Sequence, residues 1–373
     1  MNVGISLLTL FPGRVGGSET YIRGLLDAFS VGDGPELSTV LASRHSGPSV
    51  AAFAGRHVDI VSVGAYRPGN RRLTRAAAMS LARLSRARIT RQVPPAIDLI
   101  HYPLTVPIPH GLGVPSVVSL ADLQHRDLPE MFSKFERIYR RRAYDQAAQS
   151  ADQVVTFTHF AAQRISAELN VEIDRIAVIP HGIDHARFTR AGADADIPGL
   201  PDRYIYFPAN DWPHKNHRRL VAAFEKVADP SLSLVLTGQV NHWPEMRGAN
   251  ERIVHLGHVP AEQVAPLYRG AEAMIFPSLY EGFGLPPLEA MACGCPVAAS
   301  NTGAVAEVCG DAALLFDPND TDAIADAITR ISGDATLRSS LIEAGVERAA
   351  SFTWEQSARR HLAVYHKALA VTV

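Results

Sequence analysis

Residues 271–300 read AEAMIFPSLYEGFGLPPLEAMACGCPVAAS, an apolar strand, a loop broken by glycine, a helix and a second strand. Pro286 and Pro287 suit the first turn of the helix, where backbone N–H groups have no partner inside the helix. Free N–H groups at a helix start bind phosphate. Glu281 lies on the loop before this anion site, and Glu289 lies about one turn inside the helix. The pattern predicts a parallel β-α-β unit that binds the two ends of a phosphate-linked ligand.

The same alternation of short apolar runs and longer helical patterns extends along most of the 373 residues, which predicts parallel sheets built from β-α-β units. A chain of this length exceeds one hydrophobic core, so we expect two domains. Residues 185–202, rich in Gly and Pro, are predicted to link an N-terminal domain, residues 1–184, to a C-terminal domain, residues 203–352. A last helix within residues 353–373 is a candidate to cross back to the N-terminal domain.

Short apolar runs mark the expected strands. In the first domain they are residues 2–10, 37–42, 58–63, 98–102, 116–120, 153–157 and 176–179. In the second they are residues 204–207, 232–236, 253–256, 273–276 and 296–300. Ligands of open parallel sheets bind beyond the carboxyl ends of strands, so we expect the chemistry in loops that follow strands.

The composition excludes several classes of protein. With 47% hydrophobic and 20% charged residues, the chain is typical of a soluble globular protein, and its formal net charge of -2 argues against a dedicated nucleic-acid binder. No apolar stretch is long enough to span a bilayer. The apolar N-terminus lacks the basic region and cleavage site of a signal peptide. We therefore expect a cytoplasmic protein.

The three cysteines are Cys293, Cys295 and Cys309, too few and too clustered for a disulfide framework. No histidine completes a zinc-like spacing with them. We expect buried thiols at helix ends and predict no metal site.

Gly16 and Gly17 follow the first expected strand and precede a helix. Their lack of side chains would let a substrate approach the backbone beside the helix N-terminus, although a simple tight turn explains the pair as well. The loop does not have the spaced glycines of dinucleotide-binding enzymes.

Two further loops after strands carry polar candidates. Asn210, His214 and Lys215 follow the strand at 204–207, and the Lys215 ammonium would suit a diphosphate, unless it is a solvated surface lysine. Asp122 and His125 follow the strand at 116–120 and would suit a catalytic base or a contact to an acceptor hydroxyl. A polar loop without a catalytic role is the alternative for this second pair.

Eight arginines and no acidic residue lie between Arg67 and Arg91. Their helical spacing, with leucine and methionine between them, fits a basic amphipathic helix that contacts anionic lipid or an anionic acceptor. A solvated helix face is the alternative.

These segments together resemble the retaining glycosyltransferases of family 4. The Glu-x7-Glu segment from Glu281 to Glu289, Gly16-Gly17-Ser18-Glu19, Pro180-His181-Gly182-Ile183-Asp184 and Pro213-His214-Lys215-Asn216 occur in the order seen in that family. The resemblance covers nearly the whole chain. It implies the GT-B fold, in which two Rossmann-like parallel-sheet domains face each other across a cleft.

The resemblance also implies roles for individual residues. Glu281 would contact hydroxyls of the donor sugar and Glu289 the ribose of its nucleotide. Phe283, Gly284 and Leu285 would present backbone N–H groups to the sugar and diphosphate, and Lys215 would neutralise the leaving diphosphate. Family members need no metal ion, because cations and a helix dipole replace it.

Two positions depart from the family pattern. Many members have an arginine five residues before the lysine, where this chain has Asn210, so His214, Arg218 or Arg219 is a candidate substitute. Many also have a histidine before the aspartate of the first-domain loop, where this chain has Ala121, and His125 is the candidate replacement.

The residues around Asp122 and Lys215 look most like bacterial members that transfer mannose or related sugars in surface-polysaccharide assembly. The resemblance therefore implies a GDP-sugar donor and a glycan or lipid-linked acceptor, with UDP- and dTDP-sugars still open. A nucleotide-sugar epimerase of similar plan and a non-catalytic nucleotide-sugar binding subunit are the alternatives.

Overall fold

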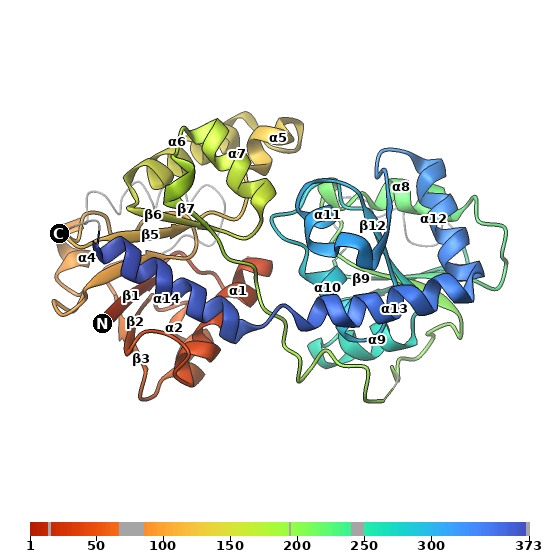
Figure 1. The fold of residues 1–373 in the computed structure, drawn as a ribbon, viewed down its shortest axis with the longest axis horizontal. Coiled ribbons are helices and arrows are strands. Elements are labelled where there is room, and N and C mark those ends of the chain that lie inside the picture. Colours follow the sequence, from red (N-terminus) through yellow and green to blue (C-terminus); the bar gives the residue numbers. More distant parts are fainter. Residues whose placement is uncertain (14–15, 67–85, 194, 240–249, 371–373) are drawn as a thin grey trace. The chain divides into compact units, whose positions relative to one another are not determined.

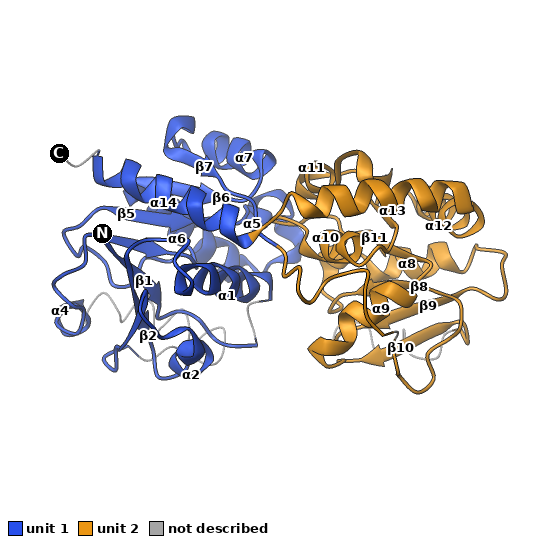
Figure 2. Ribbon diagram, turned by 60° about the horizontal axis from the view of Figure 1, so that its bottom comes forward, with its two compact units in different colours: residues 1–182, 354–373 blue, residues 183–353 orange. Residues whose placement is uncertain are grey.

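The computed structural model describes residues 1–13, 16–66, 86–193, 195–239 and 250–370, and the chain divides into two compact units (Figures 1 and 2). The first unit contains residues 1–182 and 354–373, and the second contains residues 183–353. Residues 185–202, expected as a linker, are therefore part of the second unit. The last helix, α14 (Trp354–Ala370), is part of the first.

Within the described part of the first unit, seven parallel strands form one sheet in the order β3-β2-β1-β4-β5-β6-β7. The strands are β1 (Asn2–Leu7), β2 (Leu37–Ala42), β3 (Val58–Ser62), β4 (Leu99–Tyr102), β5 (Ser116–Ser119), β6 (Gln153–Thr156) and β7 (Ile176–Val178). The first strand ends before the expected residue 10, because a turn closes there with the Leu10 N–H donating to the Leu7 carbonyl at 3.1 Å.

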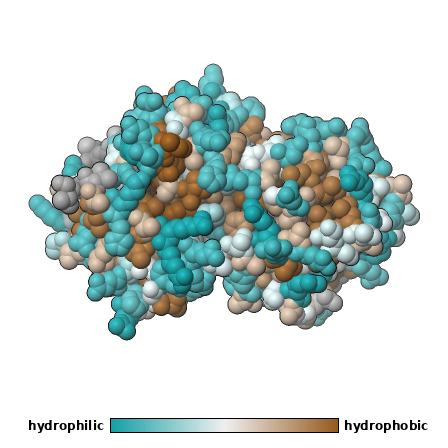
Figure 3. All heavy atoms as spheres, in the orientation of Figure 1, coloured by the Kyte–Doolittle hydropathy of each residue, from teal (hydrophilic) through white to brown (hydrophobic). Residues whose placement is uncertain are grey.

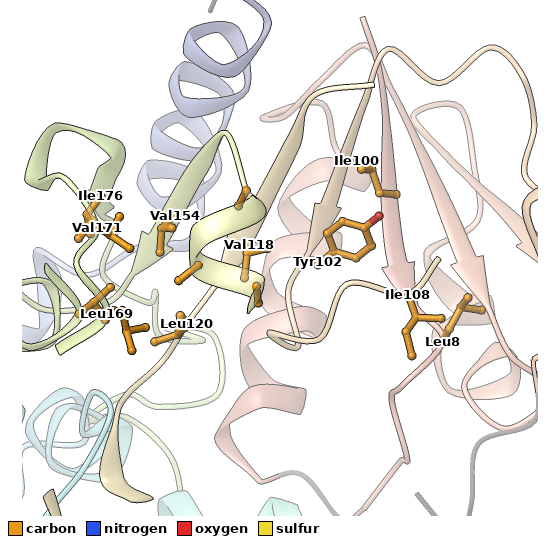
Figure 4. Close-up of a cluster of buried hydrophobic side chains, with 14 of the residues drawn as sticks. Leu8, Ile100, Tyr102, Ile108, Val118, Leu120, Val154, Leu169, Val171 and Ile176 are labelled. Carbon is orange, nitrogen blue, oxygen red and sulfur yellow. The ribbon is translucent and has the colours of Figure 1, made fainter. Parts of the chain in front are cut away.

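The α-helices in the described part of the first unit are α1 (Gly17–Ser30), α2 (Gly47–Val50), α4 (Arg86–Thr90), α5 (Gln124–Asp127), α6 (Lys134–Ser150), α7 (His159–Leu169) and α14. Apolar side chains of β4, β5 and β6 pack against the C-terminal part of α6 and against α7 (Figure 4). The labelled members of this core include Ile100, Tyr102, Val118, Leu120, Val154 and Leu169.

The last helix packs beside α1 and across β4, β5 and β6. Gly24 of α1 permits this contact, because a Cβ there would lie 2.1 Å from the Trp354 indole. A buried polar network completes the interface. The Tyr21 hydroxyl lies 2.7 Å from His361 Nε2, and the Tyr365 hydroxyl lies 2.9 Å from His101 Nδ1. These bonds satisfy polar groups that would be costly to bury alone.

Within the described part of the second unit, six parallel strands follow the order β10-β9-β8-β11-β12-β13. They are β8 (Tyr204–Pro208), β9 (Ser233–Thr237), β10 (Ile253–Gly257), β11 (Ala273–Phe276), β12 (Val297–Ser300) and β13 (Ala313–Phe316). The expected strands did not include β13. It is a four-residue strand at the edge of the sheet, with its two middle residues incompletely buried, so its sequence pattern is short.

The helices of the second unit are α8 (His217–Phe224), α9 (Val264–Gly270), α10 (Leu285–Ala292), α11 (Gly303–Cys309), α12 (Thr321–Gly333) and α13 (Ala335–Ala350). None of the described helices of the chain is long and apolar enough to cross a membrane. The face drawn in Figure 3 is mainly hydrophilic, with separate groups of hydrophobic side chains on each unit.

Strand order locates the ligand-binding edge of each sheet. In the second unit the chain builds outward from β8 to β9 and β10 and then returns to place β11 on the other side of β8. Parallel sheets bind ligands at the carboxyl ends of strands where the order reverses in this way. The loops after β8 and β11, which carry Lys215 and Glu281, therefore lie at the switch point.

Candidate functional site

The loops that follow β8 and β11 are tied together by their backbones. The Leu279 N–H donates to the His214 carbonyl at 2.8 Å. Asn216 adopts φ 63°, and its amide nitrogen donates to the carbonyls of Pro277 at 3.1 Å and Pro318 at 2.7 Å. Asparagine is one of the few residues with a side chain that tolerates this left-handed backbone. Asn216 thus fixes the short 3-10 turn Pro213–Lys215, on which Lys215 stands.

Lys215 and Glu281 form an ion pair across these two loops. The Lys215 Nζ lies 2.7 Å from Glu281 Oε1, and the side chains are only 12% and 14% exposed. The ammonium also lies 5.3 Å from the centre of the Phe276 ring, the last residue of β11. The structure therefore brings together two residues that are 66 positions apart in sequence and holds a cation at the carboxyl edge of the sheet.

His214 adds a neutral ring beside this pair. The pKa of His214 is lowered to about 4, chiefly by burial and also by Lys215, while Glu281 acts to raise it. The imidazole is therefore uncharged at neutral pH. His214 can offer a hydrogen bond to a diphosphate but cannot replace the charge of the arginine that the family pattern has at position 210.

Asn210 has a positioning contact. Its side-chain oxygen accepts a hydrogen bond of 2.8 Å from the backbone N–H of Gln239, in the loop after β9. This bond links the loops that follow β8 and β9. Arg219 donates to the side-chain oxygen of Asn216 at 3.1 Å, so its guanidinium is engaged in the same loop. Among the described residues, the ion pair with Glu281 is made by Lys215.

The start of α10 has the geometry expected of an anion site. Gly284 is the residue before the helix and adopts φ 115°, a backbone conformation that residues other than glycine rarely adopt. Pro286 and Pro287 occupy the first turn and need no partner for a backbone N–H. Gly284 and Leu285 stand at the helix start, where backbone N–H groups have no partner inside the helix. The turn therefore presents donors to an anion, with Phe283 buried at its base.

Glu289 lies in the same helix but in a different environment from Glu281. Its Oε2 accepts a long hydrogen bond of 3.5 Å from the Tyr268 hydroxyl. Burial raises the pKa of Glu289 to about 7, while the Arg187 charge and the Tyr268 bond lower it and Asp184 raises it. Near neutral pH this side chain exists both as an acid and as a carboxylate. Sequence reasoning did not identify Tyr268 or Arg187, because neither belongs to a local motif.

The structure places Gly16 and Gly17 at the N-terminus of α1 in the first unit. Gly16 precedes the 14-residue helix with φ 53°, and both glycines are exposed. A Cβ on Gly17 would meet no atom within 4 Å, so the space above it is open. The Glu19 carboxylate accepts the Gly13 N–H at 2.7 Å and braces the preceding turn.

Asp122 and His125 lie after β5 in the first unit. The Asp122 carboxylate accepts the Gln124 N–H at 2.9 Å and shapes the start of α5. His125 is buried edge-on against the Tyr144 ring, with ring centres 4.9 Å apart. The pKa of His125 is lowered to about 4, chiefly by burial and also by Arg140, Arg126 and Arg141, while Asp127 acts to raise it. The ring is thus neutral and enclosed, which makes Asp122 the more accessible of the two.

The remaining predictions concern the thiols and the basic segment. All three cysteines are buried, and burial raises the pKa of Cys293 and Cys309 to about 12. In the described part of the chain, no group of three His, Cys, Asp or Glu residues is arranged to hold a metal ion.

Residues 67–85 of the basic segment lie outside the described residues. Arg86, in α4, donates to the Gly111 carbonyl at 2.7 Å.

Comparison with known proteins identifies the family of the chain. Residues 15–187 match Glycosyltransferase Family 4, and residues 197–348 match Glycosyl transferases group 1. The chain is 31% identical to O-antigen chain mannosyltransferase B of Escherichia coli over 72% of this chain and 74% of that one. It is 28% identical to D-inositol 3-phosphate glycosyltransferase of Corynebacterium glutamicum over 71% of this chain and 68% of that one.

Solved structures share the fold. Sucrose-phosphate synthase of Thermosynechococcus elongatus has a TM-score of 0.78 at 21% identity, with 100% of both chains covered. The Anabaena protein HepE, solved with UDP and glucose, has a TM-score of 0.73 at 17% identity and covers 98% of this chain and 100% of its own. The chain belongs to glycosyltransferase family 4 and has the GT-B fold. It is a glycosyltransferase of glycan assembly, and the epimerase and binding-subunit alternatives are not favoured.

Proposed function

We propose that the chain moves a hexose, mannose or a related sugar, from a nucleoside diphosphate sugar to a glycan or lipid-linked acceptor, with retention of configuration and without a metal ion or cofactor. GDP-sugar is the favoured donor. The observation that carries this proposal is the Lys215–Glu281 pair, held at 2.7 Å at the switch point of the second sheet. Similarity to a mannosyltransferase of O-antigen assembly supports the choice of sugar and acceptor.

Each residue has a defined part in this reaction. Lys215 and the N–H groups of Phe283, Gly284 and Leu285 bind the diphosphate and stabilise the charge that develops on it. Glu281 accepts hydrogen bonds from sugar hydroxyls, and Glu289 accepts them from the ribose. Asn210 and His214 shape and line the loop that holds Lys215.

Transfer exchanges one bond for another at the anomeric carbon. The bond from that carbon to the diphosphate oxygen breaks as the bond to the acceptor oxygen forms on the same face. The acceptor proton passes to an oxygen of the leaving diphosphate, so the products are the new glycoside and a nucleoside diphosphate. In the first unit, Gly16, Gly17, Asp122 and His125 are proposed to contribute to the acceptor side, with Asp122 orienting the acceptor hydroxyl.

The location is proposed to be the cytoplasm, with peripheral contact at the inner face of the cell membrane through the basic segment from Arg67 to Arg91. Eight arginines without an acidic residue support this contact, because each cation is attracted to anionic lipid.

The test combines donor binding and transfer. Thermal unfolding is measured with GDP-, UDP- and dTDP-sugars, because a ligand that binds the native state raises the unfolding temperature. The stabilising donor is then incubated with lipid-linked and free glycans in EDTA, and the anomeric configuration of the product is read by NMR. We expect a GDP-sugar to be the stabilising donor and transfer to proceed in EDTA. The product should keep the anomeric configuration of the donor. An epimerised donor without acceptor, or transfer abolished by EDTA, would overturn it.

A further inference from the structure

The N-terminal half of α6 has no buried side chain. The buried residues of this 17-residue helix are Ala147 and Ala148, both near its end. Earlier in the helix, Phe135 is 55% exposed and Ile138 is 56% exposed. Large apolar side chains next to each other on a helix surface indicate an interaction site more often than single exposed ones do.

Cations surround these two apolar side chains. Residues 134–142 carry five basic side chains and one acidic one, although the whole chain has a formal net charge of -2. The acidic residue, Glu136, is held in a capping box with Ser133, whose hydroxyl donates to Glu136 at 2.9 Å. Among the described residues, no ion pair involves the exposed basic side chains Lys134, Arg137, Arg141 and Arg142.

The apolar and basic side chains share one face. At about 100° per residue, the six exposed residues of this half fall within an arc of about 160°. They are Lys134, Phe135, Arg137, Ile138, Arg141 and Arg142. Arg140 is directed elsewhere, with its guanidinium 4.8 Å from the Phe132 ring, so it stiffens the start of the helix. This half of α6, drawn above the sheet of the first unit in Figure 1, therefore presents a basic face with an apolar pair in it.

We propose that this face of α6 docks on an anionic lipid surface. Phe135 and Ile138 enter the boundary between headgroups and acyl chains, and the four exposed cations bind lipid phosphates. Interfacial helices bind by combining buried apolar area with attraction to anionic lipid, and both are present here. The residues of this face lie outside the basic segment of residues 67–91 in sequence, and the proposal does not depend on the identity of the transferred sugar.

The test is vesicle flotation with two kinds of variant. Wild type is floated with phosphatidylcholine vesicles, with and without one third phosphatidylglycerol. The double variant Phe135→Ser/Ile138→Ser removes the apolar pair, and Arg137→Gln/Arg142→Gln removes two charges. Ile173→Ser is the matched control, because Ile173 is 57% exposed on a different segment. Unfolding temperatures and transfer to a soluble acceptor are measured for every variant.

We expect wild type to float only with the anionic vesicles. The apolar variant should bind at least about tenfold more weakly, and the charge variant about 25-fold more weakly at about fivefold per cation. Ile173→Ser should float as wild type does, and transfer to the soluble acceptor should stay unchanged in all three.

Equal flotation with neutral and anionic vesicles, or no flotation of wild type, would overturn the proposal. So would undiminished flotation of both α6 variants, or an equal loss in Ile173→Ser. A variant with Arg71, Arg72 and Arg75 changed to Gln separates the two surfaces. If it abolishes flotation while the α6 variants still float, the contact belongs to residues 67–91 and not to α6.

Discussion

Replacing Glu281 by Gln removes the carboxylate that pairs with Lys215 and nearly preserves the shape of the side chain. The Lys215 ammonium lies 2.7 Å from that carboxylate. A nucleoside diphosphate must therefore compete with Glu281 for the charge of Lys215. Glu281→Gln should consequently bind the free nucleoside diphosphate more tightly than wild type, even though the variant transfers sugar more slowly.

The size of this effect follows from the burial of the pair. Exposed ion pairs contribute about 0 to 1 kcal/mol, and breaking a buried pair costs about 3 to 5 kcal/mol. With side chains 12% and 14% exposed, Lys215 and Glu281 lie between these limits. We therefore expect the ion pair to oppose binding of the nucleoside diphosphate by about 1 to 2 kcal/mol. Its removal in Glu281→Gln corresponds to about five- to thirtyfold tighter binding.

The assay is calorimetric titration of GDP and UDP, which lack the sugar that Glu281 would contact. Wild type, Glu281→Gln, Lys215→Met and the double variant form a cycle. The gain should vanish in the double variant, because no ammonium remains to be released. Transfer by Glu281→Gln should fall by about a hundredfold or more, as for other lost transition-state contacts. Equal or weaker binding of both nucleotides by Glu281→Gln would show that Glu281 does not compete with the diphosphate for Lys215.

Three further predictions follow from other parts of the molecule. The pKa of Glu289 is raised to about 7, so the affinity for GDP should rise between pH 6 and 8 as the carboxylate forms, and the rise should be absent in Glu289→Gln. Burial lowers the pKa of His361 to about 4 and that of His181 to about 3. As the pH falls below about 6.5, these histidines take up protons in the unfolded protein before they do so in the folded protein. Urea unfolding should therefore show about 1 to 2 kcal/mol less stability per histidine at pH 5 than at pH 7, and pH-independent stability would contradict this. Gly24→Ala should lower the unfolding temperature, because its Cβ would lie 2.1 Å from Trp354. Gly55→Ala, where nothing lies within 4 Å, should not, and equal melting of the two would contradict the docking of α14 on Gly24.

Much of the fold follows from local patterns. The twelve expected strands each overlap a strand of the structure, because buried parallel strands are short apolar runs between turns. The order of the strands does not follow from such patterns, since it depends on which faces the helices cover. The edge strand β13 was not predicted, because an incompletely buried run of four residues has no clear period.

The candidate site was predictable to a similar extent. The glycine and proline residues around Gly284 mark a helix start with free donors, and the structure has that turn. The pairing of Lys215 with Glu281 and the contact of Tyr268 with Glu289 depend on strand neighbours and helix packing, so no local signal contains them. His125 is a polar loop residue in the sequence, whereas the fold encloses it beside Tyr144.

We propose that the donor binds in the second unit, on the loops after β8 and β11. Hydrogen exchange of backbone amides, measured with and without GDP-mannose, tests this most directly. We expect slower exchange in residues 210–216 and 281–289, with the largest effect at the amides of Gly284 and Leu285, and loss of that protection in Lys215→Met. Unchanged exchange in both segments at a saturating donor concentration, or protection confined to the first unit, would contradict it.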